Sequence, residues 1–201
     1  MKFKLQLVLI VLMSLNSFAI TLENCHQADE RLLKRASEES YVTIDEIVEH
    51  IDLNIEFNNG IDEDMIEDLM DAKETILCAR EKINDFNFKC YEKDESGKNR
   101  AMVTLPFIGK DVDVYAEQMN DVARTLTFQG VVGIVIHEAT HKCGTTDSHY
   151  FIKDGFSPYS SFFNNWSNIA DTFSWWALKG FCIPHENGKF SHVDSACVDG
   201  L

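Results

Sequence analysis

The chain has 201 residues, with 33 acidic and 18 basic side chains and a formal net charge of −15 at pH 7. This charge repels nucleic-acid phosphates and anionic lipid head groups, so the composition argues against nucleic-acid and membrane partners. The acidic residues keep the protein soluble, and they would favour cationic peptides as ligands.

The first 19 residues have the pattern of a secretory signal. Lys2 and Lys4 precede an apolar run from residue 5 to residue 15, and small residues at 17 and 19 occupy the positions that a signal peptidase reads. The apolar run is too short to span a membrane. We therefore expect residues 1–19 to be removed on export and residues 20–201 to form a single domain. The mature protein is expected to be a monomer without a membrane segment, either secreted or periplasmic.

All six cysteines follow this segment: Cys25, Cys78, Cys90, Cys143, Cys182 and Cys197. An even number in an exported chain predicts three disulfides. The spacing contains no C-x-x-C pair, which argues against a thiolate zinc site. Spacing alone does not fix the pairing, but Cys78 with Cys90 and Cys182 with Cys197 are plausible pairs.

Helical periodicity dominates the first part of the predicted domain. Apolar residues recur at helical spacing in residues 24–39 and 43–56, which predicts two amphipathic helices. Residues 62–84 predict a third helix, and the acidic residues at positions 62–64 complement the dipole at its N-terminal end.

A region of strand-like alternation follows. Residues 86–91 and 101–105 predict two strands separated by a polar turn that contains Gly97, and residues 112–115 predict a third, short strand. These strands are expected to form a small antiparallel sheet.

Two more helices complete the predicted domain. The apolar residues 131–136 predict a buried helix that continues to residue 141, and a Gly follows three residues later, where a helix would stop. Residues 167–178 predict the last helix, capped by Ser167 and ended by Gly180. The predicted fold class is α+β, mainly helical, with the antiparallel sheet packed on the helix that ends at residue 141.

Residues 137–147 carry the strongest functional signal in the chain. His137 and His141 are four residues apart, so on a helix both rings project from one face and can bind one Zn²⁺, with Glu138 beside it as general base. This is the H-E-x-x-H arrangement of the zincins, and it predicts one zinc ion per chain. Catalytic zinc usually keeps three protein ligands. Gly144 lets the chain turn back after the helix, so that either Asp147 or His149 supplies the third ligand.

The residues after this motif resemble one zincin family. Residues 144–150, Gly-Thr-Thr-Asp-Ser-His-Tyr, are similar to the G-T-x-D-x-x-Y element of the aspzincins, the deuterolysin family of zinc endopeptidases. Residues 170–173, Ala-Asp-Thr-Phe, are similar to the family's A-D-[ST]-[YF] segment. The resemblance implies a zincin-like fold and Asp147 as third ligand. The chain departs from the family at Phe151, where Gly is usual, and at Ile169, which interrupts the family's N-A-D triplet.

The resemblance also implies a mechanism and a substrate. Zinc activates a water molecule, Glu138 takes its proton, and Tyr150 donates a hydrogen bond to the developing oxyanion of a peptide or protein substrate. In the lysine-preferring branch, the residue matching Asp171 lies in the pocket for the side chain after the cut, which implies a weak preference for basic residues. The alternative role for Asp171 is that of a buried acid that orients a zinc-binding histidine.

Other interpretations of the motif remain. It also fits H-E-x-x-H-x-x-G-x-x-D, a variant of the metzincin signature, but metzincins need a methionine after the motif and all six methionines precede it. Two other functions are a secreted binding or inhibitory protein whose zinc is a structural clamp, and a zinc amidase that acts on cell-wall peptides. Zinc without hydrolysis would indicate the first, and a narrow substrate without activity on casein would indicate the second.

Overall fold

The computed structural model describes residues 19–57, 63–98, 100–147 and 166–181, and two short strands, β5 (Ile183–Pro184) and β6 (Phe190–Ser191). Five α-helices lie in this part of the chain: α1 (Gln27–Phe57), α2 (Glu63–Ile83), α3 (Ala116–Thr125), α4 (Thr127–His141) and α6 (Ala170–Lys179). A 3₁₀ turn, η1 (Trp166–Asn168), precedes α6. Residues 1–18 of the predicted signal, His149, Tyr150 and the predicted Cys182–Cys197 pair lie outside the described residues.

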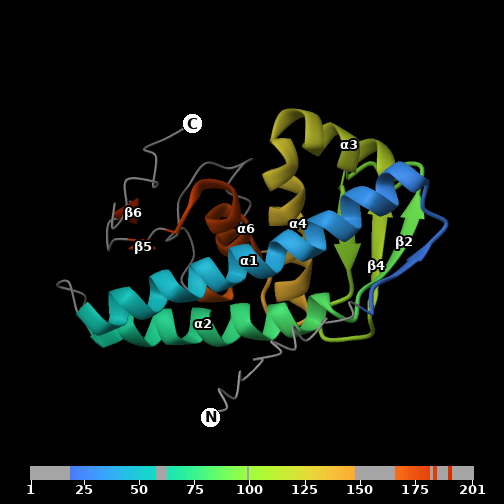
Figure 1. Ribbon diagram of the computed structural model, residues 1–201. Helices are drawn as coiled ribbons and strands as arrows, with labels where there is room; N and C mark the ends of the chain where they lie inside the picture. The colour runs from blue at the N-terminus through green and yellow to red at the C-terminus, as the bar shows by residue number, and fades with distance from the viewer. Residues whose placement is uncertain are drawn as a thin grey trace, which may run out of the picture.

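Helix α4 is the centre of the helical core. It contacts α1, α2, α3 and α6, and Figure 1 shows α1 and α2 running side by side past it, with the sheet at one end. Its apolar segment is buried as predicted except at Ile134, which is partly exposed, since Val131, Val132, Val135 and Ile136 have no exposed surface. A helix covered on this many sides has little freedom to shift, which makes α4 a rigid support for the side chains at its C-terminal end.

Four strands form a mixed sheet: β1 (Thr21–Glu23), β2 (Asn87–Tyr91), β3 (Met102–Thr104) and β4 (Asp111–Tyr115). Their order is β1-β2-β4-β3, in which β1 and β4 run parallel to β2 and β3 runs antiparallel to β4. Phe88, Val112 and Val114 are fully buried and join the same apolar core as α4. The sheet therefore buries one face, and β3 forms one of its edges.

The predicted antiparallel sheet is wrong in its pairing. The strands at 86–91 and 101–105 do not pair, because β4 lies between β2 and β3. Alternation indicates which face of a strand is buried, but it does not specify which strand lies next to it. The connection between β2 and β3 is stabilised by Asp94, whose carboxylate accepts hydrogen bonds from the backbone N of Ser96 and Arg100 at 2.9 and 3.1 Å.

The two helices expected at 24–39 and 43–56 are one continuous helix, α1. The gap between the two sequence patterns contains Ser40 and Tyr41, which are both buried. Ser40 Oγ donates a hydrogen bond to the Ala36 carbonyl at 2.7 Å. Such a bond to the preceding turn is compatible with a helix interior, so the polar residue does not break the helix.

The other helices differ in how well the sequence predicts them. Helix α2 confirms the prediction for residues 62–84, with Glu63 and Asp64 in its first turn. The short helix α3 was not expected, and Met119 is its one buried residue. None of the helices in the described part of the chain is both long and apolar enough to cross a membrane.

Helix α6 begins at Ala170 and not after a Ser167 cap. The residues before it bond to the segment that follows α4: Thr146 N donates to the Asn168 carbonyl at 2.9 Å, and Ala170 N donates to the Thr146 carbonyl at 3.2 Å. This pairing places Ser167 in η1 instead. Gly180, with φ of 97°, ends α6 as predicted.

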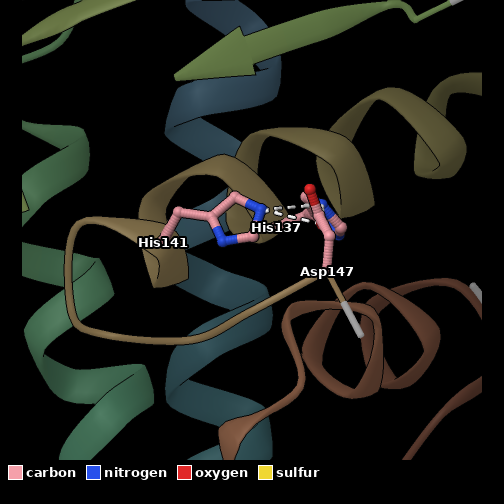
Figure 2. A group of neighbouring side chains, drawn as sticks. All are labelled: His137, His141 and Asp147. Carbon is pink, nitrogen blue, oxygen red and sulfur yellow. Dashed lines mark hydrogen bonds and ion pairs between the residues drawn. The ribbon is translucent and has the colours of Figure 1, made fainter. Parts of the chain in front are cut away.

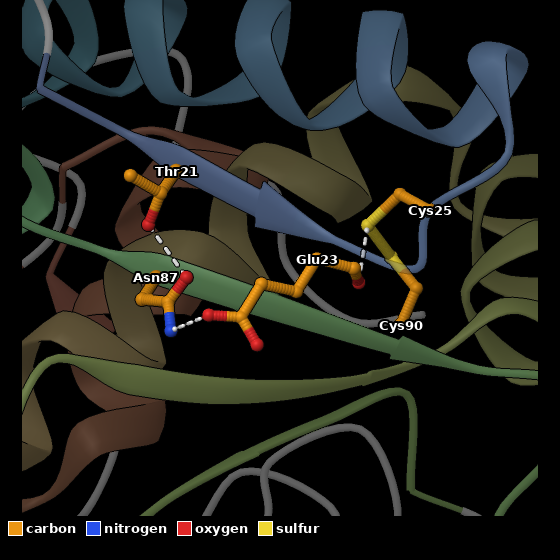
Figure 3. The surroundings of a disulfide bond; sticks show 5 residues. All are labelled: Thr21, Glu23, Cys25, Asn87 and Cys90. Atoms are coloured by element: carbon orange, nitrogen blue, oxygen red, sulfur yellow. Dashed lines mark hydrogen bonds between the residues drawn. A yellow bond between two sulfur atoms is a disulfide. The ribbon is translucent and has the colours of Figure 1, made fainter.

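Two disulfides are present among the described residues. Cys25–Cys90 ties the chain after β1 to β2 (Figure 3), and Cys78–Cys143 ties α2 to the residues that follow α4. The predicted Cys78–Cys90 pair is wrong, because the parallel pairing of β1 with β2 brings Cys25 to Cys90 and leaves Cys78 facing Cys143. The disulfides indicate an oxidising, extracellular compartment.

The two disulfides provide a matched stability test, because each closes a loop with a sequence separation of 65 residues. Removing either pair by double Cys→Ser substitution should lower the free energy of unfolding by a similar amount, about 2–5 kcal/mol, in denaturant titrations. Only removal of Cys78–Cys143 should also weaken metal binding, because this disulfide lies two residues after His141. Equal metal affinity in both double variants would contradict this prediction.

Candidate metal centre

Three predicted metal ligands converge in the structure. His137 and His141 lie on the last turn of α4, and Asp147 approaches them from the segment that follows (Figure 2). Asp147 Oδ1 is 3.0 Å from Nε2 of each histidine, and the two Nε2 atoms are 3.2 Å apart. Ligand atoms bonded at about 2.05 Å to a tetrahedral zinc ion lie about 3.3 Å from one another. The donor set therefore fits a metal ion, although the geometry does not identify which one.

The turn after α4 delivers Asp147 to the histidines. Gly144 adopts φ of 105°, the left-handed region in which a side chain is strained, and thereby confirms its predicted role. Thr145 N then donates to the Thr140 carbonyl at 3.2 Å, and its hydroxyl donates to Thr140 Oγ1 at 3.0 Å. The backbone bonds of Thr146 with the segment before α6 hold the next residue in place. The segment that carries Asp147 is thus bonded both to the end of α4 and to the residues at the start of α6.

Each histidine is oriented by a second hydrogen bond at Nδ1. His137 Nδ1 is 2.9 Å from Asp171 Oδ1, and His141 Nδ1 is 3.0 Å from the Thr145 carbonyl. A carbonyl oxygen only accepts hydrogen bonds, so Nδ1 of His141 carries the proton and Nε2 is left with a lone pair. Metal-binding histidines commonly show this arrangement, in which the distal nitrogen donates to an oxygen and the other nitrogen binds the ion.

Asp171 occupies the position that its second predicted role requires. It is buried in the first turn of α6, and its Oδ1 also accepts a hydrogen bond from Ser174 Oγ at 3.3 Å. These contacts favour an orienting role toward His137. The predicted role of Asp171 in a pocket for basic side chains stays a prediction, although the residue does line the cleft.

The charges of His137, His141 and Asp147 favour a cation among the three side chains. Burial alone would lower the pKa of His137, but hydrogen bonds with Asp147 and Asp171 raise this pKa to about 10. Burial opposes ionisation of Asp147, yet its hydrogen bonds with the two histidines hold its pKa well below the usual range. Two carboxylates and two imidazoles in contact are thus stable with a positive charge between them, which either a proton or a metal ion supplies.

Glu138 is buried beside the triad. It is 5% exposed, and burial raises the pKa of its carboxyl group, partly offset by the positive charge of the histidines and a backbone hydrogen bond from Thr104. Its Oε2 atom has no hydrogen-bond partner among the described protein atoms. A buried carboxylate oxygen without a partner is costly unless a ligand or water occupies the adjacent space.

The triad opens into a cleft of about 1060 Å³. His137, Glu138, His141 and Asp147 all line it, and the Asp147 side chain is 46% exposed. One side of the metal site therefore faces a space large enough for a peptide segment.

Lys142 is a residue near the site that the sequence reasoning missed. Its side chain is buried, and Nζ donates hydrogen bonds to the carbonyls of Leu105 and Ile108 at 2.9 and 2.7 Å. These bonds tie the loop between β3 and β4 to the end of α4, beside His141. The sequence does not show that Lys142 is buried, because its partners are backbone carbonyls more than thirty residues away. A lysine exposed to solvent could occupy the same position in the sequence pattern.

Comparison with known proteins gives no match, since no protein family, curated protein sequence or solved structure is significantly similar to this chain. The resemblance to the aspzincins, the zincin-like fold and the role of Tyr150 therefore stay predictions.

Substitution of three of the four acids that line the cleft should distinguish a metal ligand from a residue that orients a ligand. We expect Asp147→Asn to weaken zinc binding by at least about a hundredfold, because it removes an anionic ligand, and Asp171→Asn by about 10–100-fold, because it loosens His137. Asp121→Asn, which changes an exposed acid of the same cleft outside the triad, should leave zinc affinity unchanged. Competition with a fluorescent chelator measures all three. Wild-type affinity in Asp147→Asn would exclude this residue as a ligand.

Metal binding should release a proton. The raised pKa of His137 means that its ring is protonated at neutral pH before a cation binds, so the ion must displace that proton. Apparent zinc affinity should accordingly increase by about tenfold per pH unit between about pH 7 and 9. Calorimetry in buffers of different ionisation enthalpy reports the proton directly. An affinity that does not change over this range would contradict the expectation.

Proposed function

We propose that this chain is an exported, zinc-dependent endopeptidase, secreted or periplasmic. The observation that carries the proposal is the convergence of His137, His141 and Asp147 within 3.2 Å of one another, with the buried carboxylate of Glu138 beside them. Two imidazoles and one carboxylate are an ordinary donor set for catalytic zinc. The two disulfides, which indicate an oxidising compartment, are consistent with export.

Each residue of the site has a separate role in the proposed reaction. When bound, zinc supplies a Lewis acid that lowers the pKa of a water ligand toward about 7. Glu138 is suited to accept a proton, because burial raises its pKa and Oε2 is not engaged in a hydrogen bond with the described protein atoms. Asp171 and the Thr145 carbonyl hold the imidazoles in the orientation that presents Nε2 to the metal. Tyr150 remains the proposed donor to the oxyanion.

The edge of the sheet supports a peptide as substrate. Strand β3 pairs with β4 on one side, and no strand of the described chain pairs with its other side. Val103 and Thr104 of β3 line the same cleft as Glu138. An extended peptide can add to such an edge through backbone hydrogen bonds. These hydrogen bonds would align the peptide backbone along the cleft largely independently of the peptide's sequence.

Glu138→Gln tests the proposed catalysis directly. The amide retains the shape of the carboxylate and is not a ligand of the triad, so the variant should bind zinc like the wild type but lose about 10²–10⁴-fold in turnover. Zinc analysis and digestion of casein and a peptide library measure the two properties. A variant that cleaves at the wild-type rate would show that Glu138 is not the base.

The same experiment distinguishes the alternative functions. A wild-type protein that binds zinc and hydrolyses nothing would indicate a binding or inhibitory protein with a structural zinc ion. Hydrolysis of cell-wall peptides without activity on casein would indicate an amidase. Because two histidines and a carboxylate also bind Fe²⁺, the metal analysis should include iron, and iron at stoichiometric amounts would contradict the zinc assignment.

A further inference from the structure

The cleft continues beyond Glu138 along the N-terminal part of α4, and its character changes there. Five apolar side chains line this part, and each of them is only partly buried. They come from α3 and its C-cap, from α4 and from α6: Val122, Leu126, Ile134, Trp175 and Leu178. We refer to these five residues as the apolar subsite. Apolar surface that remains accessible inside a cleft is typical of a place where a ligand's apolar group binds.

The helical spacing sets this subsite directly beside the proposed base. Ile134 lies one turn before Glu138 on α4, and Gly130 lies one turn before Ile134, so the three share one face. A Cβ atom at Gly130 would lie 2.5 Å from Leu126 Cβ, so the glycine is what lets Leu126 pack over α4 at this point. The subsite is therefore built by close packing and is not a gap left by a missing side chain.

Helix α6 supplies the opposite wall with the same periodicity. Trp175 and Leu178 follow Asp171 by four and seven residues, which places all three on the face of α6 that lines the cleft. Gly133 permits the two helices to approach, since a Cβ there would lie 3.0 Å from the Ser174 carbonyl oxygen. The distance between the two walls is thus fixed by backbone contact.

The charges around the subsite do not favour a basic ligand group. Asp171 is engaged by His137 Nδ1 and by Ser174, as described above. The charged residues that line the cleft away from the triad and Glu138 are Lys98, Arg100 and Asp121, which include both signs. A lysine side chain entering the subsite would exchange water for apolar walls without gaining a free carboxylate inside it.

We propose that the apolar subsite binds a large aliphatic or aromatic side chain of the substrate peptide, at a position next to the bond held at the metal. The inference deepens the proposed endopeptidase function, and it makes Leu126, Ile134 and Leu178 residues that determine specificity. It differs from the preference for basic residues that the sequence resemblance implies, because the acid on which that preference depends orients a histidine.

Equilibrium binding tests the proposal without relying on catalysis. The zinc-loaded Glu138→Gln protein is titrated with matched hexapeptides that differ only in one central residue, Ala, Leu, Phe, Lys or Glu, and whose other residues and capped ends are uncharged. The Leu and Phe peptides should bind at least about tenfold more tightly than the Ala peptide, and the Lys peptide should bind no more tightly than the Ala peptide. Tightest binding of the Lys peptide, equal binding of all five or binding of none would overturn the proposal.

A charge placed in the subsite should reverse this ranking. Leu178 is partly exposed, so Leu178→Glu is compatible with folding; the variant should lose the preference for Phe and gain affinity for the Lys peptide. Gln129→Glu adds the same charge to an exposed position of α4 outside the cleft lining and should keep the wild-type ranking. Leu178→Ala, which adds no charge, should weaken binding of the Phe peptide several-fold. An unchanged ranking in Leu178→Glu would overturn the assignment of these residues.

The outcomes also separate this inference from the proposed function. If the wild type hydrolyses no peptide but the apolar ranking holds, the subsite stands and the endopeptidase proposal fails. If the wild type hydrolyses peptides and cuts beside lysine or arginine, the endopeptidase proposal stands and the apolar subsite fails.

Discussion

The contact of the Asp147 carboxylate with Nε2 of both His137 and His141, at 3.0 Å in each case, constrains the whole site. Buried imidazoles and a carboxylate hold this arrangement when a cation lies among them, because otherwise the lone pair of a ring nitrogen would face a negative oxygen. The hydrogen bonds at the opposite ring nitrogens, to Asp171 and to the Thr145 carbonyl, leave the Nε2 atoms directed at this point. The arrangement is therefore one that a metal ion would satisfy, and Glu138, the proposed proton acceptor, is buried beside it.

The rest of the fold keeps this contact in place. Helix α4 is packed by four other helices, so the two histidines share a rigid support. Asp147 lies on a short segment instead, and three local features hold it: the positive φ of Gly144, the Cys78–Cys143 disulfide, and the pairing of Thr146 with the start of α6. Since α6 also carries Asp171, the position of this helix affects both Asp147, the candidate third ligand, and the orientation of His137. Catalytic metal sites commonly depend on such support around the ligands.

The sequence predicted the parts of the structure that depend on local pattern. It indicated the buried helix before His137, the helix at 62–84 and the turn at Gly144, because periodicity and turn residues are readable along the chain. The need for a third ligand left Asp147 and His149 as candidates, and only the resemblance to the aspzincins favoured Asp147. The sequence did not predict what depends on distant partners. The insertion of β4 between β2 and β3, the Cys25–Cys90 pair and the bonds of Lys142 each join segments that no local pattern connects. The sequence also left two roles open for Asp171, a substrate pocket and the orientation of a histidine. The contact of Asp171 with His137 in the structure favours the second role.

We infer that this chain binds one catalytic metal ion through two imidazoles and one aspartate. Anomalous diffraction at the zinc absorption edge, from crystals of the protein purified without chelators, tests it most directly. We expect a single zinc ion about 2.0–2.2 Å from Nε2 of His137, Nε2 of His141 and one carboxylate oxygen of Asp147, with a remaining position open to the cleft. A zinc ion held by other residues, or an Asp147 carboxylate turned away from it, would contradict this inference.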